Sequence, residues 1–262
     1  MKSIVIAISS LMLLLLINVG CSSTPESSEN VDPETENKDT IEILESDSPL
    51  TDPDSNLLVD TLIVGKYKVI VTQTDETMTL VDSHSKYEPI DEKKLLKTTS
   101  GVNRNADALL FTLRSGKNVR LTDVNISEDE GNFLETVSYQ YEKTIKNYWQ
   151  LKALCYEYHF TVIMNQITGD TIRSIAPGAF SPSNDLLFCS NIDMESQFTP
   201  NGIEIYELSK GYHSKIGFAR ISNWGLKDLV WISDTKLTAT RVDVTDRMTY
   251  ELRNVTIELI ER

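Results

Sequence analysis

The 262-residue sequence has few of the residues and spacings that most enzymes use for chemistry. It contains three histidines and three cysteines, and no two cysteines stand in a C-x-x-C spacing, which excludes a thioredoxin-like dithiol. It also lacks H-E-x-x-H, G-x-S-x-G, a Walker loop and a strand followed by G-x-G-x-x-G, the patterns of zinc proteases, serine hydrolases and nucleotide-binding proteins. We therefore expect a protein that is not an enzyme and that binds no cofactor and no metal ion.

Clusters of basic residues are also missing. The chain has 25 lysine and arginine residues against 39 aspartate and glutamate residues, which gives a formal net charge of −14. Binding of nucleic acid needs a basic patch or stripe, so we expect no nucleic-acid partner. The acidic balance does not predict a cationic ligand either, because most of it comes from one segment near the N-terminus.

An apolar leader opens the chain. Residues 1–20 carry a single charge, Lys2, and no charged residue stands between Ile4 and Val19. This pattern is typical of a secretory signal peptide, and the apolar run is shorter than the roughly 20 residues that a membrane-spanning helix needs. A retained membrane anchor is the alternative, but no basic stop-transfer cluster follows the run.

The leader ends in the sequence NVGC, in which Cys21 is the last residue. This junction resembles the lipobox of bacterial lipoproteins. The resemblance implies that residues 1–20 are removed as a signal peptide and that fatty chains such as palmitate are attached to Cys21. Two or three chains would hold a protein on a bilayer, because each buried methylene contributes about 0.8 kcal/mol. We expect a lipid-anchored protein on the extracytoplasmic side of a membrane of the bacterial cell envelope. A soluble periplasmic protein with an incidental cysteine is the alternative.

The segment 21–56 is acidic and poor in apolar residues. Beyond Cys21 it contains eleven acidic residues and one base, Lys38. Such a composition does not bury enough apolar surface to offset the entropy of ordering. We therefore expect 21–56 to be a disordered linker between the membrane and a folded domain, rather than an acidic binding segment.

Residues 57–262 are long enough for one domain with a sizeable core. Apolar and polar residues alternate with a period of two more often than with the helical period of 3.6. Short runs rich in β-branched and aromatic residues recur, separated by Gly, Asn, Asp and Pro. The stretch 107–124 predicts a strand, a Ser-Gly turn and a strand. Helix signals are weak, and 91–97 predicts one or two helical turns. The stretch 127–148 contains Glu, Lys and Leu residues that suit a helix and an alternating VSYQY segment that suits a strand. We favour a strand at 134–143. These features predict an all-β domain, either a sandwich, a meander of antiparallel strands or a propeller.

One region resembles a blade of a β-propeller. The sequence APGAFSPSNDLLFCSNID precedes NGIEIYELSKG. In propeller blades, a turn like FSPSN leads into one strand, and a segment like IEIYEL forms the next strand of the same sheet. The phase places five apolar residues on one inward face, namely Leu186, Phe188, Ile203, Ile205 and Leu208. Residues 139–242 also resemble an uncharacterised family of secreted bacterial proteins, through 180–184, 201–207 and 224–237. That resemblance implies the β fold and no assigned activity.

Histidine and cysteine residues are the first candidates for a functional site. His84 lies in a polar loop beside Asp82 and serine residues, where a hydrolase triad is less plausible than a solvated loop. His159 is predicted within an aromatic strand and His213 in an exposed turn. Cys155 and Cys189 lie in strand-like stretches of an exported chain, so a disulfide between them is permitted. Spacing does not show whether the two strands are close enough, and two separate buried thiols are the favoured interpretation.

Oxygen ligands and tryptophans are the remaining candidates. The loop 193–201 contains carboxylate and amide oxygens that Ca²⁺ prefers, but its spacing matches no EF-hand, so we interpret it as a long surface connection. No carboxylate pair stands out as a general acid and base. Trp149, Trp224 and Trp231 are either core residues or the wall of a sugar or peptide groove.

The sequence therefore predicts a membrane-anchored envelope lipoprotein with a non-enzymatic domain that binds a protein or a glycan. An envelope hydrolase whose residues meet only in the folded chain is the alternative. A pocket with a histidine or a carboxylate pair of perturbed pKa would favour the hydrolase. A broad aromatic surface would favour binding. A structural role without a small ligand is a third possibility.

Overall fold

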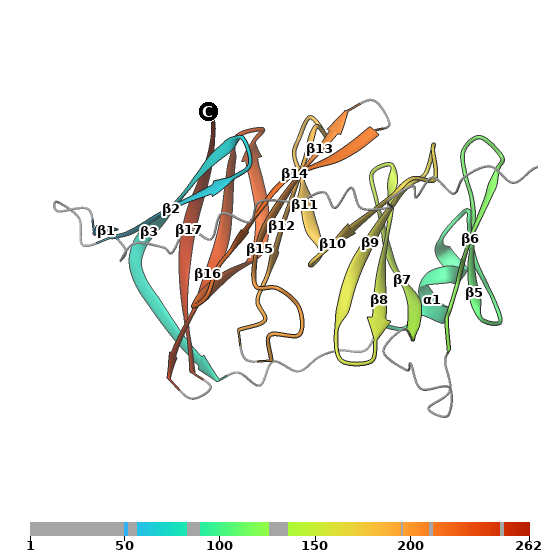
Figure 1. The fold of residues 1–262 in the computed structure, drawn as a ribbon, viewed down its shortest axis with the longest axis horizontal. Helices are drawn as coiled ribbons and strands as arrows, with labels where there is room; N and C mark the ends of the chain where they lie inside the picture. Colours follow the sequence, from blue (N-terminus) through green and yellow to red (C-terminus); the bar gives the residue numbers. More distant parts are fainter. Residues whose placement is uncertain are drawn as a thin grey trace, which may run out of the picture. The chain divides into compact units, whose positions relative to one another are not determined.

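The computed structural model describes residues 50–51, 57–82, 90–125, 136–194, 196–209, 212–246 and 249–262. Within these ranges the chain forms antiparallel strands in four sheets, together with one short helix (Figure 1). The all-β class predicted from the alternation of residues is thereby confirmed. The apolar leader with Cys21, most of the acidic linker, and His84 lie outside the described residues.

A three-stranded sheet and the helix come first along the domain. The helix α1 (Glu92–Thr98) begins after Asp91, whose carboxylate accepts a hydrogen bond from the Lys94 backbone N–H at 3.0 Å and so caps an unpaired donor of the first turn. Both the helix expected at 91–97 and the hairpin expected within 107–124 are confirmed. The strands of this sheet are β4 (Val102–Asn105), β5 (Ala108–Thr112) and β6 (Asn118–Thr122).

The next four strands form a meander, which we call the β7–β10 sheet. Its strands are β7 (Val137–Ile145), β8 (Tyr148–Cys155), β9 (His159–Asn165) and β10 (Thr171–Ser174). The strand predicted at 134–143 is confirmed from Val137 onward, whereas residues 134 and 135 lie outside the described residues. Trp149 on β8 packs against Phe111 on β5, with ring centroids 5.1 Å apart. These two side chains belong to the apolar cluster that joins the β7–β10 sheet to the three-stranded sheet.

Strands β12 (Leu186–Asn191) and β13 (Gly202–Ser209), at the centre of the β11–β14 sheet, are buried on both faces. Leu186, Phe188, Ile203 and Ile205 contribute to an apolar cluster shared with a six-stranded sheet. Their neighbours Leu187, Cys189, Tyr206 and Leu208 contribute to a cluster shared with the β7–β10 sheet, because successive strand residues point to opposite faces. The predicted phase is therefore right for four residues and wrong for Leu208. The outer strands of this sheet are β11 (Gly178–Phe180) and β14 (Tyr212–Arg220).

The six-stranded sheet combines strands from both ends of the domain. Its order is β1-β2-β3-β17-β16-β15, so that β3 near the start of the domain pairs with β17 near its end. Its short first strand lies inside the segment predicted as linker. The strands are β1 (Leu50–Thr51), β2 (Leu58–Val64), β3 (Tyr67–Asp82), β15 (Trp224–Ser233), β16 (Lys236–Asp246) and β17 (Thr249–Glu261).

A close backbone approach connects the six-stranded sheet to β14. Gly65, in the turn between β2 and β3, has a φ of +57°, and a Cβ atom there would lie 2.1 Å from the carbonyl oxygen of Ile216. A larger residue at position 65 is incompatible with this contact, in addition to the backbone strain that a left-handed φ imposes.

All of the described residues belong to one compact unit of the chain. Its sheets pack face to face in a row, from the three-stranded sheet through the β7–β10 and β11–β14 sheets to the six-stranded sheet (Figure 1). One apolar cluster fills each of the three junctions between neighbouring sheets. The core of the domain is therefore divided into three layers rather than gathered in one centre.

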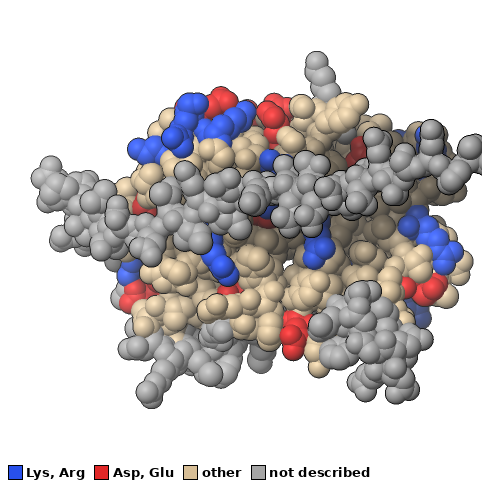
Figure 2. All heavy atoms as spheres, in the orientation of Figure 1, with Lys and Arg blue, Asp and Glu red and all other residues tan. Residues whose placement is uncertain are grey.

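Charged side chains are mixed on the surface. On the part of the face in Figure 2 that belongs to described residues, basic and acidic side chains are interspersed among uncharged ones.

Candidate binding groove

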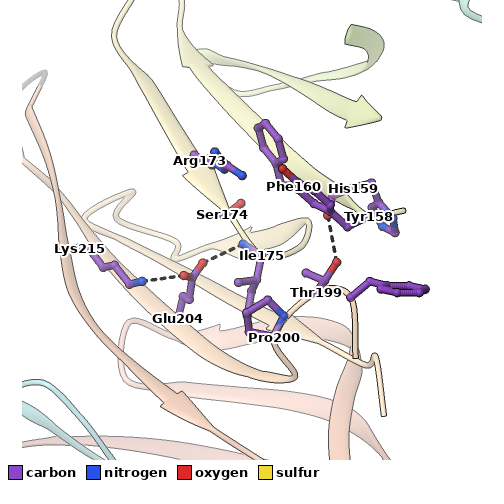
Figure 3. A pocket seen from close by; sticks show the side chains of 11 residues that line it. Tyr158, His159, Phe160, Arg173, Ser174, Ile175, Thr199, Pro200, Glu204 and Lys215 are labelled. Carbon is purple, nitrogen blue, oxygen red and sulfur yellow. Dashed lines mark hydrogen bonds and ion pairs between the residues drawn. The ribbon is translucent and has the colours of Figure 1, made fainter. Parts of the chain in front are cut away.

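A groove of about 350 Å³ lies where the β7–β10 sheet meets the β11–β14 sheet. Its walls come from the start of β9, the end of β10, the loop before β13 and the facing strands β13 and β14 (Figure 3). The volume is within the range of roughly 300–1,000 Å³ that small-molecule sites occupy. The charged, aromatic and hydroxyl side chains at its wall include Phe160, Arg173, Phe198, Thr199, Glu204 and Lys215.

Glu204 is a buried carboxylate at this groove, with only 4% of the residue exposed. One of its oxygens lies 2.8 Å from Lys215 Nζ. The other accepts hydrogen bonds from the Ile175 backbone N–H at 2.9 Å and from the Tyr206 hydroxyl at 3.0 Å (Figure 3 draws the first). A buried charge is tolerated only when it is paired and hydrogen-bonded, and Glu204 meets both conditions. Because both oxygens already have partners, Glu204 is not a free general base.

Two buried groups behind Glu204 have strongly raised pKa values. Burial is the main cause of the raised pKa of the Tyr206 phenol, and the negative charge of Glu204 raises it further. Burial likewise raises the pKa of the Cys189 thiol, with a further contribution from Glu204. Both groups are therefore uncharged at neutral pH. A thiol is nucleophilic as its thiolate, so Cys189 is inert.

Arg173 provides a positive charge at the groove. Its guanidinium carbon lies 3.8 Å from the centre of the Phe160 ring, and the residue is exposed. Within the described ranges no carboxylate forms an ion pair with it. The ring holds the planar guanidinium in place through a cation–π contact, while the N–H donors of the guanidinium keep the capacity to bind an anion.

Aromatic rings form the rim of the groove. Tyr158 stacks on Phe160 with ring centroids 6.4 Å apart and an angle of 27° between the ring planes, and both side chains are half-buried. Phe198, in the loop before β13, is 54% exposed and also lines the groove. Exposed aromatic faces in a concave site are typical of ligand contacts, so the rim is the apolar part of a binding surface.

His159 begins strand β9, as the sequence predicted, and its exposed side chain lines the groove. Partial burial of the ring is the main reason why its pKa is lowered from 6.5, and the positive charge of Lys152 lowers it further. The imidazole is therefore neutral at neutral pH. A histidine of perturbed pKa does line the groove, which is the feature that would favour the hydrolase.

The serine and threonine hydroxyl groups in the groove already donate to backbone carbonyls. Ser174, which is 1% exposed, donates through Oγ to the Ala176 carbonyl at 2.9 Å. Thr199 donates through Oγ1 to the His159 carbonyl at 3.2 Å (Figure 3). A catalytic nucleophile instead donates to a base that accepts its proton. Neither hydroxyl has that arrangement.

The loop 193–201 is held by Asp193. Its carboxylate accepts hydrogen bonds from the backbone N–H groups of Gln197 at 3.0 Å and Thr199 at 2.7 Å, and from the Ser196 hydroxyl. Burial alone would raise the pKa of Asp193, but these hydrogen bonds outweigh it and lower the pKa. The loop is a surface connection, as we interpreted it, and its carboxylate serves the loop itself. It thereby fixes Phe198 and Thr199 at the groove.

The two cysteines of the domain are free thiols on different sheets. Cys155 ends strand β8 and is partly exposed, whereas Cys189 lies on β12 and is fully buried. Of the two possibilities left open by the sequence, the structure has separate thiols. Cys21 lies outside the described residues, so lipid attachment stays a prediction.

The structure corrects the prediction for His213 and shows a buried carboxylate, Glu204, that the sequence pattern did not predict. His213 was expected in an exposed turn, but it lies half-buried on strand β14, opposite Leu208 of β13. Strand β14 begins at the residue before it, Tyr212. Glu204 was overlooked as a buried carboxylate, although it stands between two isoleucines in the sequence GIEIYEL.

The tryptophans belong mainly to the core. Trp149 and Trp224 are 3% and 2% exposed. Trp231 is partly buried and donates its indole N–H to the Ala179 carbonyl at 2.9 Å. The aromatic rings that face solvent in the groove are instead the tyrosine and phenylalanines of its rim.

Within the parts of the chain that the structure describes, no group of three or more histidine, cysteine, aspartate or glutamate side chains is arranged to hold a metal ion. No helix in the same residues is long and apolar enough to cross a membrane.

Sequence reasoning missed most of the groove because its residues come from separate strands. Arg173, Glu204 and Lys215 lie on β10, β13 and β14, and no local pattern connects them. The one available signal was the carboxylate of Glu204 between two isoleucines of β13, since a buried carboxylate must have partners.

Comparison of the whole chain with protein-family models, with curated proteins and with solved structures found no match. The resemblances to lipoproteins and to an uncharacterised secreted family therefore stay predictions, and the geometry of the groove is the basis for a functional proposal.

Proposed function

We propose that the chain is a lipoprotein of the bacterial cell envelope whose β-rich domain is a non-enzymatic binding module. Lipid on Cys21 holds the chain on the extracytoplasmic side of a membrane, and the acidic linker separates the domain from the bilayer. The groove between the β7–β10 and β11–β14 sheets binds a partner that is exposed in the envelope. The apolar leader that ends at Cys21 supports the anchor.

One observation carries the binding role, namely the combination of an aromatic rim with an exposed arginine that has no acidic partner in the described residues. Phe198 is 54% exposed, and Arg173 is stacked on Phe160. Solvent-facing rings cost solubility unless they have a use, and an arginine with unused donors binds carboxylates and similar anions. Both features are explained by a ligand that covers the rim and pairs with Arg173.

A hydrolase is the second candidate, and His159 is the observation that favours it. This histidine and Glu204 line the same groove, and the pKa of His159 is lowered. Glu204, however, already accepts from three donors, and the two hydroxyls donate to carbonyls. This arrangement supports binding better than acid–base or nucleophilic chemistry.

We also propose a propeller-like relation among the sheets. Successive antiparallel sheets pack face to face in chain order, and a strand from the start of the domain completes the sheet of its last strands. Both features support that reading over a two-layer sandwich. An experimental structure in which neighbouring sheets do not pack face to face in chain order would contradict it.

The anchor is tested by labelling with palmitate. We expect the wild-type protein to incorporate the label and to sediment with membranes, and the Cys21→Ala variant to lose both properties. Equal labelling of the two proteins would overturn the lipoprotein assignment.

The binding role is tested with the detergent-solubilised full chain and insoluble envelope material from cells that lack the protein. We expect the wild type to sediment with this material and Phe198→Ala to stay in solution. Tyr212→Ala is the matched control, because Tyr212 is 81% exposed and does not line the groove. Equal sedimentation of all three proteins would contradict the proposal. Hydrolysis of the material that is lost in His159→Gln would favour the second candidate.

A further inference from the structure

We propose that the ligand of the groove is an acidic saccharide, a sugar chain whose residues bear carboxylates. This inference rests on the proposed binding function and specifies its ligand. Three features of the groove support it: its surplus of positive charge, its aromatic rim and its backbone groups, which already have hydrogen-bond partners.

The charge of the groove is positive. Arg173 and Lys215 line it together with Glu204, and His159 is neutral because its pKa is lowered. Glu204 and Lys215 neutralise each other at 2.8 Å. Arg173 is left without an ion-pair partner among the described residues. A ligand carboxylate would provide the ion-pair partner of Arg173, since a guanidinium and a carboxylate pair through two parallel hydrogen bonds.

The charges around His159 do not change this balance. Lys152 lowers the pKa of the histidine, whereas Asp193 and Glu142 raise it more weakly. The carboxylate of Asp193 is occupied by the hydrogen bonds within its own loop, and Glu142 accepts from Gln150 at 2.7 Å. Neither acid forms an ion pair with Arg173.

The rim favours a ring-shaped ligand with an apolar face. Tyr158 and Phe160 are stacked, and Phe198, in the loop before β13, lines the same groove. A pyranose ring has one face of C–H groups and an edge of hydroxyl groups. It can therefore lie on an aromatic ring while its polar edge meets donors and acceptors, in the way that amphipathic groups pack on aromatic surfaces.

The backbone of the groove disfavours a peptide. An extended peptide binds by adding a strand to an exposed sheet edge through main-chain hydrogen bonds. Here the Arg173 carbonyl accepts from the Tyr206 hydroxyl at 2.8 Å, and the Ile175 N–H donates to Glu204. Likewise, the His159 carbonyl accepts from Thr199. These backbone groups already have side-chain partners, so recognition has to come from the side chains.

The test uses isothermal titration of the detergent-solubilised full chain with three probes. Tetragalacturonate carries carboxylates on sugar rings, its methyl ester keeps the rings and loses the charges, and tetraglutamate keeps the charges and loses the rings. We expect tetragalacturonate to bind at least about tenfold more tightly than either of the others, because charge-assisted and stacking contacts then act together.

Variants assign this preference to the groove. Arg173→Gln retains a long polar side chain and is expected to remove the preference for tetragalacturonate over its ester. Phe198→Ala is expected to weaken both saccharides by a similar factor. Arg120→Gln is the matched control, since Arg120 pairs with Asp107 on the three-stranded sheet, and it is expected to bind as the wild type does. Circular dichroism verifies that each variant is folded.

The outcomes separate this inference from the proposed function. Equal binding of acid and ester, an unchanged preference in Arg173→Gln, or tighter binding of tetraglutamate would overturn the acidic saccharide. Absence of binding to every probe would also overturn it. In each of these cases a Phe198→Ala variant that no longer sediments with envelope material would leave the proposed binding function standing.

Discussion

Arg241 and Arg173 both stack on aromatic rings, but their surroundings differ. Arg241 lies on β16 with its guanidinium 4.4 Å from the centre of the Trp224 ring, and it is 4% exposed. It pairs with Asp60 on β2 and with Asp243 on its own strand. Arg173 stacks on Phe160 at 3.8 Å and is exposed, without an acidic partner among the described residues.

The difference separates a structural arginine from one that serves a ligand. A buried guanidinium is stable only when carboxylates of the protein neutralise it, and Asp60 and Asp243 do so for Arg241. At Arg173 the protein provides the stacking ring and leaves the carboxylate to come from outside. The same side-chain chemistry therefore has two roles, and the presence of an internal acid decides between them.

The largest expected effect is on stability when Arg241 is changed. Arg241→Gln leaves Asp60, which is 7% exposed, as a buried charge without its partner, so we expect a loss of about 3–5 kcal/mol in the free energy of unfolding. Denaturant titration measures it. The double variant Asp60→Asn, Arg241→Gln removes both charges and should recover part of the loss. A double variant as unstable as the sum of the two single variants would contradict the pairing.

Glu204→Gln should have an intermediate effect. The substitution removes the charge that faces Lys215 and replaces one accepting oxygen by a donor beside Tyr206 and Ile175, so we expect a loss of about 1–3 kcal/mol. Unfolding of the variant by denaturant gives the value. Glu207→Gln is the control, because the side chain of Glu207 is 45% exposed and its loss should hardly be felt. Equal stability of the two variants would show that the buried contacts of Glu204 do not stabilise the fold.

Arg173→Gln should cost less than about 1 kcal/mol of stability, because a cation–π contact at an exposed site contributes about 0.5–1 kcal/mol. Thermal and denaturant unfolding of this variant, compared with Arg241→Gln, test the distinction directly. A loss as large as that of Arg241→Gln would assign Arg173 a structural role and would remove the main support for ligand binding.

The smallest expected effect concerns His159 and pH. Its pKa in the folded state lies below the value of 6.5 of an unfolded histidine, with burial as the main cause. Below about pH 6.5 the unfolded chain therefore binds more protons than the folded chain, and stability decreases as the pH falls. The stability that is lost in acid because of His159 is therefore fully present above about pH 6.5.

We expect His159→Gln to reduce the change in unfolding free energy between about pH 7.5 and about pH 5.5. Denaturant titrations of the wild type and the variant at both values measure this change. His213→Gln provides a second histidine on a strand for comparison. A pH dependence that persists unchanged in His159→Gln would assign it to other groups.

Local patterns predicted the elements of the fold better than the faces of its sheets. The hairpin of β5 and β6 was predicted because its two strands alternate around a Ser-Gly turn. The side of the sheet on which Leu208 lies was predicted wrongly, because strands β12 and β13 are buried on both faces. Apolar residues then occupy successive positions, and alternation no longer marks an inner face.

The groove was beyond the reach of sequence patterns for a different reason. Its charge depends on which acid meets which base in space. Nothing near Arg173 in the sequence indicates that Phe160 lies under it, or that Lys215 neutralises Glu204. The spacing of residues along one strand predicts burial, but contacts between strands of two sheets depend on how those sheets pack.

The pairing of β3 with β17 has a consequence for the order in which the domain is assembled. Thr72 lies opposite Thr256 in this ladder, so one half of the six-stranded sheet must wait until nearly the whole chain has been synthesised. The β7–β10 and β11–β14 meanders need only neighbouring strands and can form earlier, because local contacts close quickly. Until the last strand arrives, the hairpin of β2 and β3 presents an open edge that other chains can join. That early hairpin must therefore be shielded until β17 emerges, and truncation at the C-terminus should lead to aggregation rather than to a smaller folded domain.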